Sequence, residues 1–154
     1  MSKYIVKTEV KLYTVFEEKS VYDNIHEEYW DFTETSYTDT SSNFNIANGY
    51  SIKPKKDIIL SGKVTIPETY NNLPVCKIEV DGFKKNQQNK HNHTITHIFI
   101  KGNNLREIGS DAFSGSSIQY FEFKEGLRHI NKNAFQNTAK LKPLNGEINF
   151  GPDI

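Results

Sequence analysis

The chain has 154 residues, of which 36% are hydrophobic and 12% aromatic, and its 19 basic and 19 acidic residues leave no net charge. This length allows one domain with its own core, and the aromatic content excludes wholesale disorder. Ten Phe and eight Tyr stand against one Trp and one Met. A core rich in aromatic and β-branched side chains favours strands over helices.

The charge is balanced overall but not locally. Residues 1–50 carry four Lys and nine acidic residues, whereas residues 51–102 carry nine Lys and four acidic residues. This layout either attracts a charged partner or supplies two separately solvated faces. The lysines are diluted by Asn, Gln and His and form no basic stripe with Arg or aromatic residues, so we expect no nucleic-acid partner.

The single cysteine and the N-terminal sequence restrict where the chain is expected to work. Cys76 has apolar neighbours in LPVCKI, which predicts a buried, unreactive thiol and no disulfide framework. The N-terminus lacks the continuous apolar segment of a signal peptide, and no stretch approaches about 18 apolar residues, the length that spans a membrane. We expect no membrane contact and a location in a virion or in the cytoplasm.

The first 60 residues are predicted to form a lead-in region of strand and loop. Polar and apolar residues alternate from Tyr4 to Phe16, which predicts a strand with a charged outer face. Val21, Ile25 and Tyr29 are spaced by four residues. This spacing fits a short amphipathic helix capped by Ser20, and it fits an aromatic-rich loop equally well.

The rest of the lead-in is predicted from turn-forming residues. Residues 33–43 are rich in Ser and Thr and are expected to form a loop or arm. Asn48-Gly49 is typical of a turn. Residues 57–67 are predicted to form two short strand pieces that meet at Ser61-Gly62.

From Val64 onward the chain repeats itself. An apolar trio with spacings of three and five residues occurs three times and ends each time on phenylalanine, and the later copies are LREIGSDAF and LRHINKNAF. Alternating strands are predicted upstream, at 64–66, 95–100 and 118–123, and a fourth unit begins at Leu141 and Leu144. The predicted interior positions are Val75, Ile78, Phe83, Leu105, Ile108, Ala112, Phe113, Leu127, Ile130, Ala134 and Phe135.

This periodicity predicts a mainly β solenoid of about three to four coils over residues 61–154, preceded by the lead-in of residues 1–60. No single unit can bury its own apolar residues, so the core forms by stacking of neighbours. The strands are expected to form one sheet, with the Ile and Phe of each trio packing from the other side. Gly109 and Gly126 are expected where the backbone needs positive φ or close approach. Asp111 and Asn133 occupy equivalent positions, which indicates turn capping.

The repeats resemble the BspA-like leucine-rich repeat family, in which a strand is followed by L-x-x-I-x-x-x-A-F at a period of about 22 residues. GKVTIPETYNNLPVCKIEVDGF, at 62–83, resembles the first unit of such arrays. The chain departs from the pattern at Asp81-Gly82, where alanine is usual in place of glycine, and after Leu144. The resemblance implies a leucine-rich-repeat solenoid and mainly non-catalytic proteins, found among bacterial and protist surface adhesins and phage-encoded proteins.

Candidate chemistry is sparse. His91 and His93, with His97 further on, suggest a transition-metal site, but the polar loop KKNQQNKHNH offers Asn and Lys where a site needs three or four convergent ligands. A solvated loop is the expected alternative, with no metal and no cofactor. Ser114 lacks the Gly-x-Ser-x-Gly context of a nucleophile, and no phosphate-binding loop is present. We therefore expect no enzyme activity.

The predicted partner surface is the outer face of the repeat sheet, at Phe99, Tyr120 and Glu122, together with the loop that carries His91 and His93. An ordinary half-solvated sheet is the alternative explanation. Two functions follow. The first is a structural or assembly component, such as a phage decoration, fibre or tail-associated protein, which binds protein partners or copies of itself. The second is an adhesin-like recognition module, with a protein ligand or, without support in the sequence, a glycan.

Overall fold

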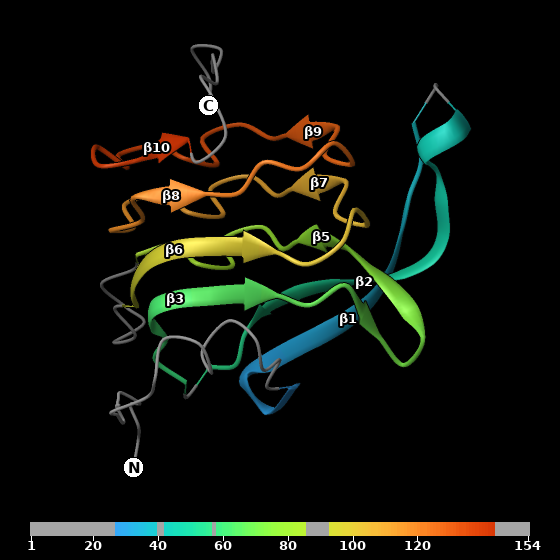
Figure 1. Cartoon of the computed structure of the whole chain (residues 1–154), viewed down its shortest axis with the longest axis horizontal. Helices are drawn as coiled ribbons and strands as arrows, with labels where there is room; N and C mark the ends of the chain where they lie inside the picture. The colour runs from blue at the N-terminus through green and yellow to red at the C-terminus, as the bar shows by residue number, and fades with distance from the viewer. Residues whose placement is uncertain (1–26, 40–41, 57, 86–92, 144–154) are drawn as a thin grey trace.

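The computed structural model describes residues 27–39, 42–56, 58–85 and 93–143 (Figure 1). The predicted strand from Tyr4 to Phe16, the loop residue His91 and the chain beyond Pro143 lie outside these residues. Two short 3-10 turns, η1 at Glu27–Tyr29 and η2 at Ser42–Phe44, accompany the strands. The strands are β1 Trp30–Tyr37, β2 Ile46–Pro54, β3 Ser61–Ile66, β4 Thr69–Tyr70, β5 Leu73–Ile78, β6 Thr94–Ile100, β7 Glu107–Ile108, β8 Tyr120–Phe121, β9 His129–Ile130 and β10 Lys142–Pro143.

The coils run back and forth between two sheets, not one. The first sheet has the order β10-β8-β6-β3 with all its strands parallel, and the second has the order β1-β2-β5-β7-β9, in which β4 pairs with β5. In Figure 1 the arrows of β6, β8 and β10 run opposite to those of β5, β7 and β9, as a solenoid requires. The expected solenoid is present, but the return segment of each coil, which carries Ile78, Ile108 and Ile130, is itself a strand.

A column of phenylalanine side chains forms the centre of the core. The ring centroids of Phe83 and Phe113 lie 4.7 Å apart with the planes 10° from parallel, and those of Phe113 and Phe135 lie 5.3 Å apart at 1°. Phe121 meets Phe113 and Phe135 edge-on. Of the eleven predicted interior residues nine are buried, and Leu127 and Ile130 are partly buried in the last return segment described.

The turns between the two sheets are also stacked by backbone hydrogen bonds. Phe83 N–H donates to Ala112 O and Phe113 N–H donates to Ala134 O, both at 2.7 Å. Each turn places an acidic or amide residue in the left-handed region: Asp81 at φ 60°, Asp111 at φ 58° and Asn133 at φ 61°. Asp and Asn tolerate this conformation better than other non-glycine residues. The interchange of Asp and Asn therefore follows from backbone conformation.

Gly109 is required for close approach and not for positive φ. A Cβ at this position would lie 2.5 Å from the backbone nitrogen of Val80, and its φ is not positive. Gly126 is similar, since a Cβ there would lie 2.2 Å from Asn103 O. Both glycines are therefore explained by close approach and not by positive φ, because neighbouring coils are in backbone contact at both sites.

The lead-in region corrects two sequence predictions. Thr33–Tyr37, expected in a Ser/Thr-rich loop, is the second half of β1, and Asn48-Gly49, expected as a turn, lies inside β2. β1 and β2 pair antiparallel from Trp30↔Pro54 to Tyr37↔Ile46, and β2 pairs in parallel with β5. Pairing with β1, in which Gly49 lies opposite Thr35, overrides the local turn preference. The hairpin turn instead lies between Tyr37 and Ile46 and includes η2.

The turn end of this hairpin is attached to the second sheet. Arg106 and Arg128, equivalent residues of the two LR-x-I repeats, both lie over the ring of Phe44, with the guanidinium carbons 5.5 Å and 3.4 Å from its centroid. Arg106 Nε also donates to Phe44 O at 2.9 Å. Tyr37 Oη is 2.6 Å from His129 Nδ1. In Figure 1 this end of the hairpin accordingly rises beside β7 and β9.

Candidate partner-binding face

The outer face of the four-stranded sheet presents one continuous row of side chains. Lys63 on β3 is in register with His97 on β6, His97 with Tyr120 on β8, and Tyr120 with Lys142 on β10. Parallel register brings such residues to neighbouring positions on the same side of the sheet. Ile98 and Phe121, the next residues along β6 and β8, point into the core and are fully buried.

The two residues in the middle of this row, His97 and Tyr120, are aromatic, and Phe99 lies two residues further along β6. The rings of His97 and Tyr120 stack with their centroids 4.6 Å apart, and those of His97 and Phe99 lie 6.0 Å apart at 13°. All three side chains are half-buried. Aromatic side chains with partly exposed faces offer large contact area with few rotatable bonds, which is why they are enriched in binding surfaces. We refer to His97, Phe99 and Tyr120 as the aromatic row.

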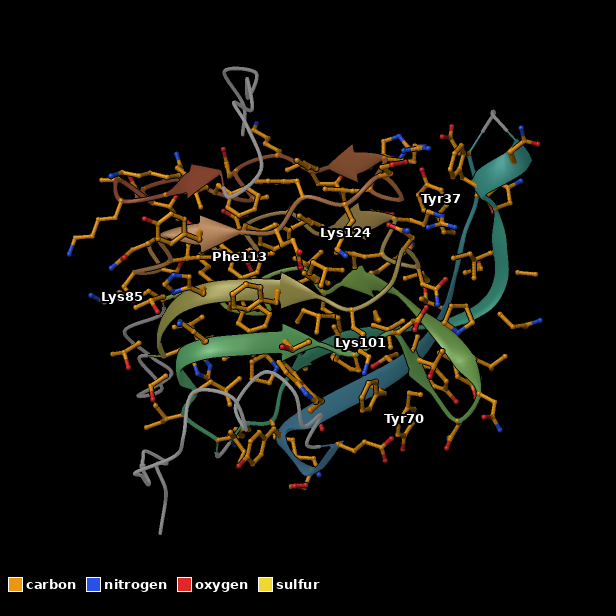
Figure 2. The ribbon with its side chains drawn as sticks, in the orientation of Figure 1. Tyr37, Tyr70, Lys85, Lys101, Phe113 and Lys124 are labelled. Atoms are coloured by element: carbon orange, nitrogen blue, oxygen red, sulfur yellow. The ribbon has the colours of Figure 1, made fainter. Side chains whose placement is uncertain are left out.

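Lysines surround the aromatic row. Lys63 and Lys142 stand at its two ends. Lys101 directly follows β6, and Lys124 lies three residues beyond the end of β8 (Figure 2). Within residues 61–66, 94–101, 120–124 and 142–143, these four lysines are accompanied by one acidic residue, Glu122. The face is therefore positively charged, which favours an acidic partner.

Glu122 is partly exposed on the face and also helps to hold it together. Its Oε1 accepts a hydrogen bond from Ile100 N–H at 2.9 Å, and its Oε2 lies 3.9 Å from Lys124 Nζ. β8 ends at Phe121, so the carboxylate continues the pairing of β6 beyond the last residue of its neighbour. Glu122 thus positions β6 against β8 and lowers the net positive charge of the face.

The structure brings together only part of the predicted partner surface. Phe99, Tyr120 and Glu122 lie on one face, with His97 joining the two aromatic residues. His93 lies elsewhere, at the start of β6, where its Nδ1 accepts a hydrogen bond from Leu60 N–H at 2.9 Å. His91 lies outside the described residues. Lys63, Lys101, Lys124 and Lys142 were not predicted, since only the register of the strands shows that they surround the same aromatic row.

No other constellation with evident chemistry is found in the described part of the chain. Those residues contain no group of three His, Cys, Asp or Glu side chains that could hold a metal ion. Cys76 is fully buried, and burial raises the pKa of its thiol above its ordinary value of 9.0, which disfavours the reactive thiolate. No helix among the same residues is long and apolar enough to cross a membrane.

Comparison with known proteins identifies the repeats. The family model for the BspA type leucine rich repeat region matches residues 77–150 in 6 copies. Residues 77–150 are therefore similar to the BspA-type leucine-rich repeat. Such arrays mediate protein interaction or surface adhesion and are typically non-enzymatic. A search of curated proteins finds no match.

Two bacterial leucine-rich repeat structures share the fold. The T. pallidum leucine rich repeat protein matches with a TM-score of 0.56 and 20% identity, over 76% of this chain and 47% of its own. A leucine rich cell surface protein from Faecalibacterium prausnitzii A2-165 matches with a TM-score of 0.50 and 23% identity, over 73% of this chain and 30% of its own. This chain thus spans less than half the length of either protein, and the likeness concerns the fold alone.

Proposed function

We propose that this BspA-type repeat chain is a non-catalytic recognition module that binds an acidic segment of a partner protein on the outer face of β3, β6, β8 and β10. The observation that carries the proposal is the aromatic row, with Lys63 and Lys142 at its ends. Half-buried aromatic side chains supply contact area, and the surrounding ammonium groups supply attraction and selectivity for negative charge.

Between the two functions expected from the sequence, this geometry favours recognition. The row spans neighbouring strands and is presented by a rigid parallel sheet, which is how repeat arrays form extended binding surfaces. One of the similar structures is a cell surface protein, in keeping with an adhesin-like role. The alternative of a phage virion component has no contact, surface or relative in its favour.

The proposal is tested by panning a random peptide library on the purified chain, because this selection works while the partner protein is still unidentified. Enriched peptides are expected to be acidic and to contain apolar anchors. Their affinity should fall at least tenfold with Tyr120→Ala, and it should weaken with rising salt because the lysines are partly or fully exposed. Lys63→Glu combined with Lys142→Glu should abolish binding.

A matched control is Gln136→Ala, at an exposed position in the turn after Phe135 and away from the sheet face. This variant should bind the selected peptides like the unaltered chain. Thermal unfolding of Tyr120→Ala should show that the fold is retained. Peptides without acidic residues, or equal binding to Tyr120→Ala, would overturn the proposal.

A further inference from the structure

A surface cavity of about 160 Å³ lies where the turn of one coil meets the first residues of β6, apart from the aromatic row. The described residues that line it are Phe83, Lys85, His93, Thr94, Gly115, Ser116 and Ser117. At about 30 Å³ per water molecule in the liquid, its volume equals that of roughly five waters. This volume is enough for one small organic group.

Lys85 lines the cavity at a position where the first coil has a different residue type from the next two coils. Two residues after the coil phenylalanine, the second and third coils have Gly115 and Asn137, both at positive φ, whereas the first coil has Lys85. Lys85 N–H donates to Ser114 O at 3.0 Å, which fixes its backbone on the next coil. A Cβ on Gly115 would lie 3.3 Å from Lys85 Cβ, so the glycine leaves room for the lysine stem.

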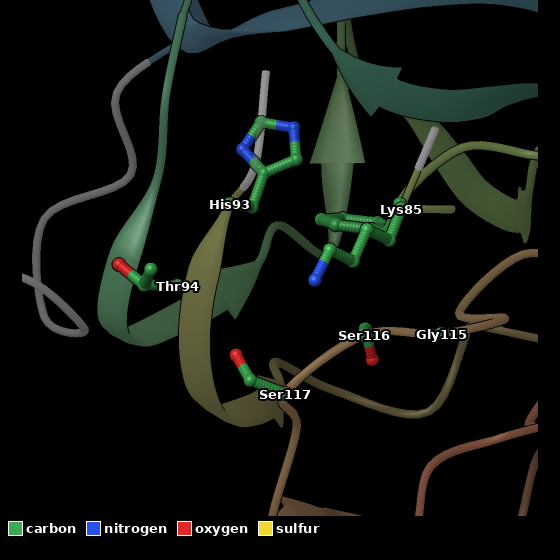
Figure 3. Close-up of a pocket in the computed structure, with 7 residues that line it drawn as sticks. Lys85, His93, Thr94, Gly115, Ser116 and Ser117 are labelled. Carbon is green, nitrogen blue, oxygen red and sulfur yellow. The ribbon is translucent and has the colours of Figure 1, made fainter. Parts of the chain in front are cut away.

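The charged group of the cavity is the Lys85 ammonium, which Figure 3 shows turned toward the open space. The Ser117 hydroxyl beside it donates to Ile95 O at 3.2 Å, and Ser116 Oγ accepts from Ile118 N–H at 3.4 Å. No carboxylate of the described residues lies within the 4.0 Å ion-pair distance of Lys85 Nζ. His93 Nδ1 accepts from Leu60 N–H at 2.9 Å, so this nitrogen is already used within the fold. Among the described residues that line the cavity none is acidic.

The floor of the cavity is apolar. Phe83 is 3% exposed and belongs to the phenylalanine column, and the His93 ring lies near it with the centroids 6.2 Å apart. A ligand that combines a negative charge with a short apolar stem would match the ammonium at one end and the ring at the other. A phosphate dianion would match less well, because it lacks a stem and prefers several cations or N–H donors.

We propose that this cavity binds a small carboxylate with a short aliphatic stem, either a free carboxylic acid or the side chain of a glutamate in a bound protein. The carboxylate pairs with the Lys85 ammonium, and the methylene groups lie against Phe83. The site is separate from the aromatic row and does not depend on the function proposed for it.

The experiment is an NMR titration of the ¹⁵N-labelled chain with acetate, butyrate and inorganic phosphate at constant ionic strength. Butyrate should give saturable shifts of the amides of Thr94, Gly115 and Ser117, with a dissociation constant on the order of millimolar for so small a ligand. Butyrate should bind more tightly than acetate, by up to about fourfold for each methylene that is fully buried. Phosphate should bind more weakly than butyrate.

Lys85→Gln should weaken butyrate binding at least fivefold. The Lys85 side chain is exposed, so the variant should keep its fold, and its amide spectrum reports this directly. Lys84→Gln is the matched control, because Lys84 is the adjacent lysine and lies 3.9 Å from Asp81; it should titrate like the unaltered chain. Equal binding to Lys85→Gln, equal binding of phosphate, or linear shifts without saturation would overturn the proposal.

Tyr120→Ala separates the two proposals. It should weaken binding of the selected peptides at least tenfold and leave the butyrate titration unchanged. A glutamate-containing peptide that competes with butyrate for the amides of Thr94 and Ser117 would identify a protein side chain as the source of the carboxylate. Absence of competition would identify the free acid as the ligand.

Discussion

The repeat coils and the β1–β2 hairpin are held in place by different kinds of contact. In the coils, the contacts join like residues at equivalent positions of neighbouring units. Phe113 packs between Phe83 and Phe135, and the backbone bond from Phe83 to Ala112 recurs from Phe113 to Ala134. The hairpin is attached by unlike pairs, such as the arginines over Phe44 and Tyr37 against His129. Contacts between like residues repeat both partners in the sequence, whereas the hairpin contacts involve Phe44 and Tyr37, which lie outside the repeat.

The largest expected effect lies in the phenylalanine column. Phe113→Ala removes a side chain that is 1% exposed and packed between two parallel rings. We expect the free energy of unfolding, measured by urea denaturation, to fall by about 3–5 kcal/mol. Val80→Ala, at a residue that is 61% exposed, should change it by less than about 0.5 kcal/mol. Equal effects of the two substitutions would contradict a core built on this column.

The next largest loss of stability is expected at Gly109, and Gly82 of the preceding coil is the comparison. Gly109→Ala would place a Cβ 2.5 Å from the backbone nitrogen of Val80, and we expect a loss of about 1–3 kcal/mol because backbone cannot move aside. Gly82→Ala introduces the residue already present at Ala112 and Ala134, with its nearest contact 3.1 Å from Glu79 O. Thermal and urea unfolding should show this variant within about 1 kcal/mol of the original chain. A reversed order would contradict the coil-to-coil contact at Gly109.

A smaller effect is expected at the left-handed turn positions. Asn133→Val places a β-branched residue at φ 61° and should lower the free energy of unfolding by about 1–2 kcal/mol. Asp111→Asn exchanges the two residue types that the coils already use there, and it should stay within about 0.5 kcal/mol. Chemical denaturation of both variants checks this; a tolerated valine would show that the turn can adopt another conformation.

The smallest effect concerns attachment of the hairpin. A double-mutant cycle of Phe44→Ala and Arg128→Ala should give a coupling free energy of about 0.5–1 kcal/mol, the range for a cation–π contact near the surface. Arg128→Lys should retain part of it, since the ammonium can still lie over the ring. Zero coupling would mean that the remaining contacts, including Tyr37 with His129, hold the hairpin without the arginines.

The candidate face could be predicted only in part, because some of its features are local in sequence and others depend on contacts between distant segments. Phe99 and Tyr120 were predicted as outward-facing because alternation along a strand is a local property. That His97 joins them, and that Lys63 and Lys142 stand at the ends of the row, depends on register between strands more than 20 residues apart. The cavity at Lys85 depends on the stacking of two coils and on a glycine in the second. Neither arrangement has a local sequence signal.

The coils can be predicted from the amino-acid sequence alone, because each unit places Ile, Phe and a small residue in the same environment and so repeats the same residues. The remaining features arise from contacts between distant segments. These contacts turn the return segments into a second sheet, and they convert Thr33–Tyr37 and Asn48-Gly49 from expected loop and turn into paired strands. The physical reason is that backbone pairing between β1 and β2, and of β2 with β5 from Tyr50 onward, outweighs the preference of any short segment.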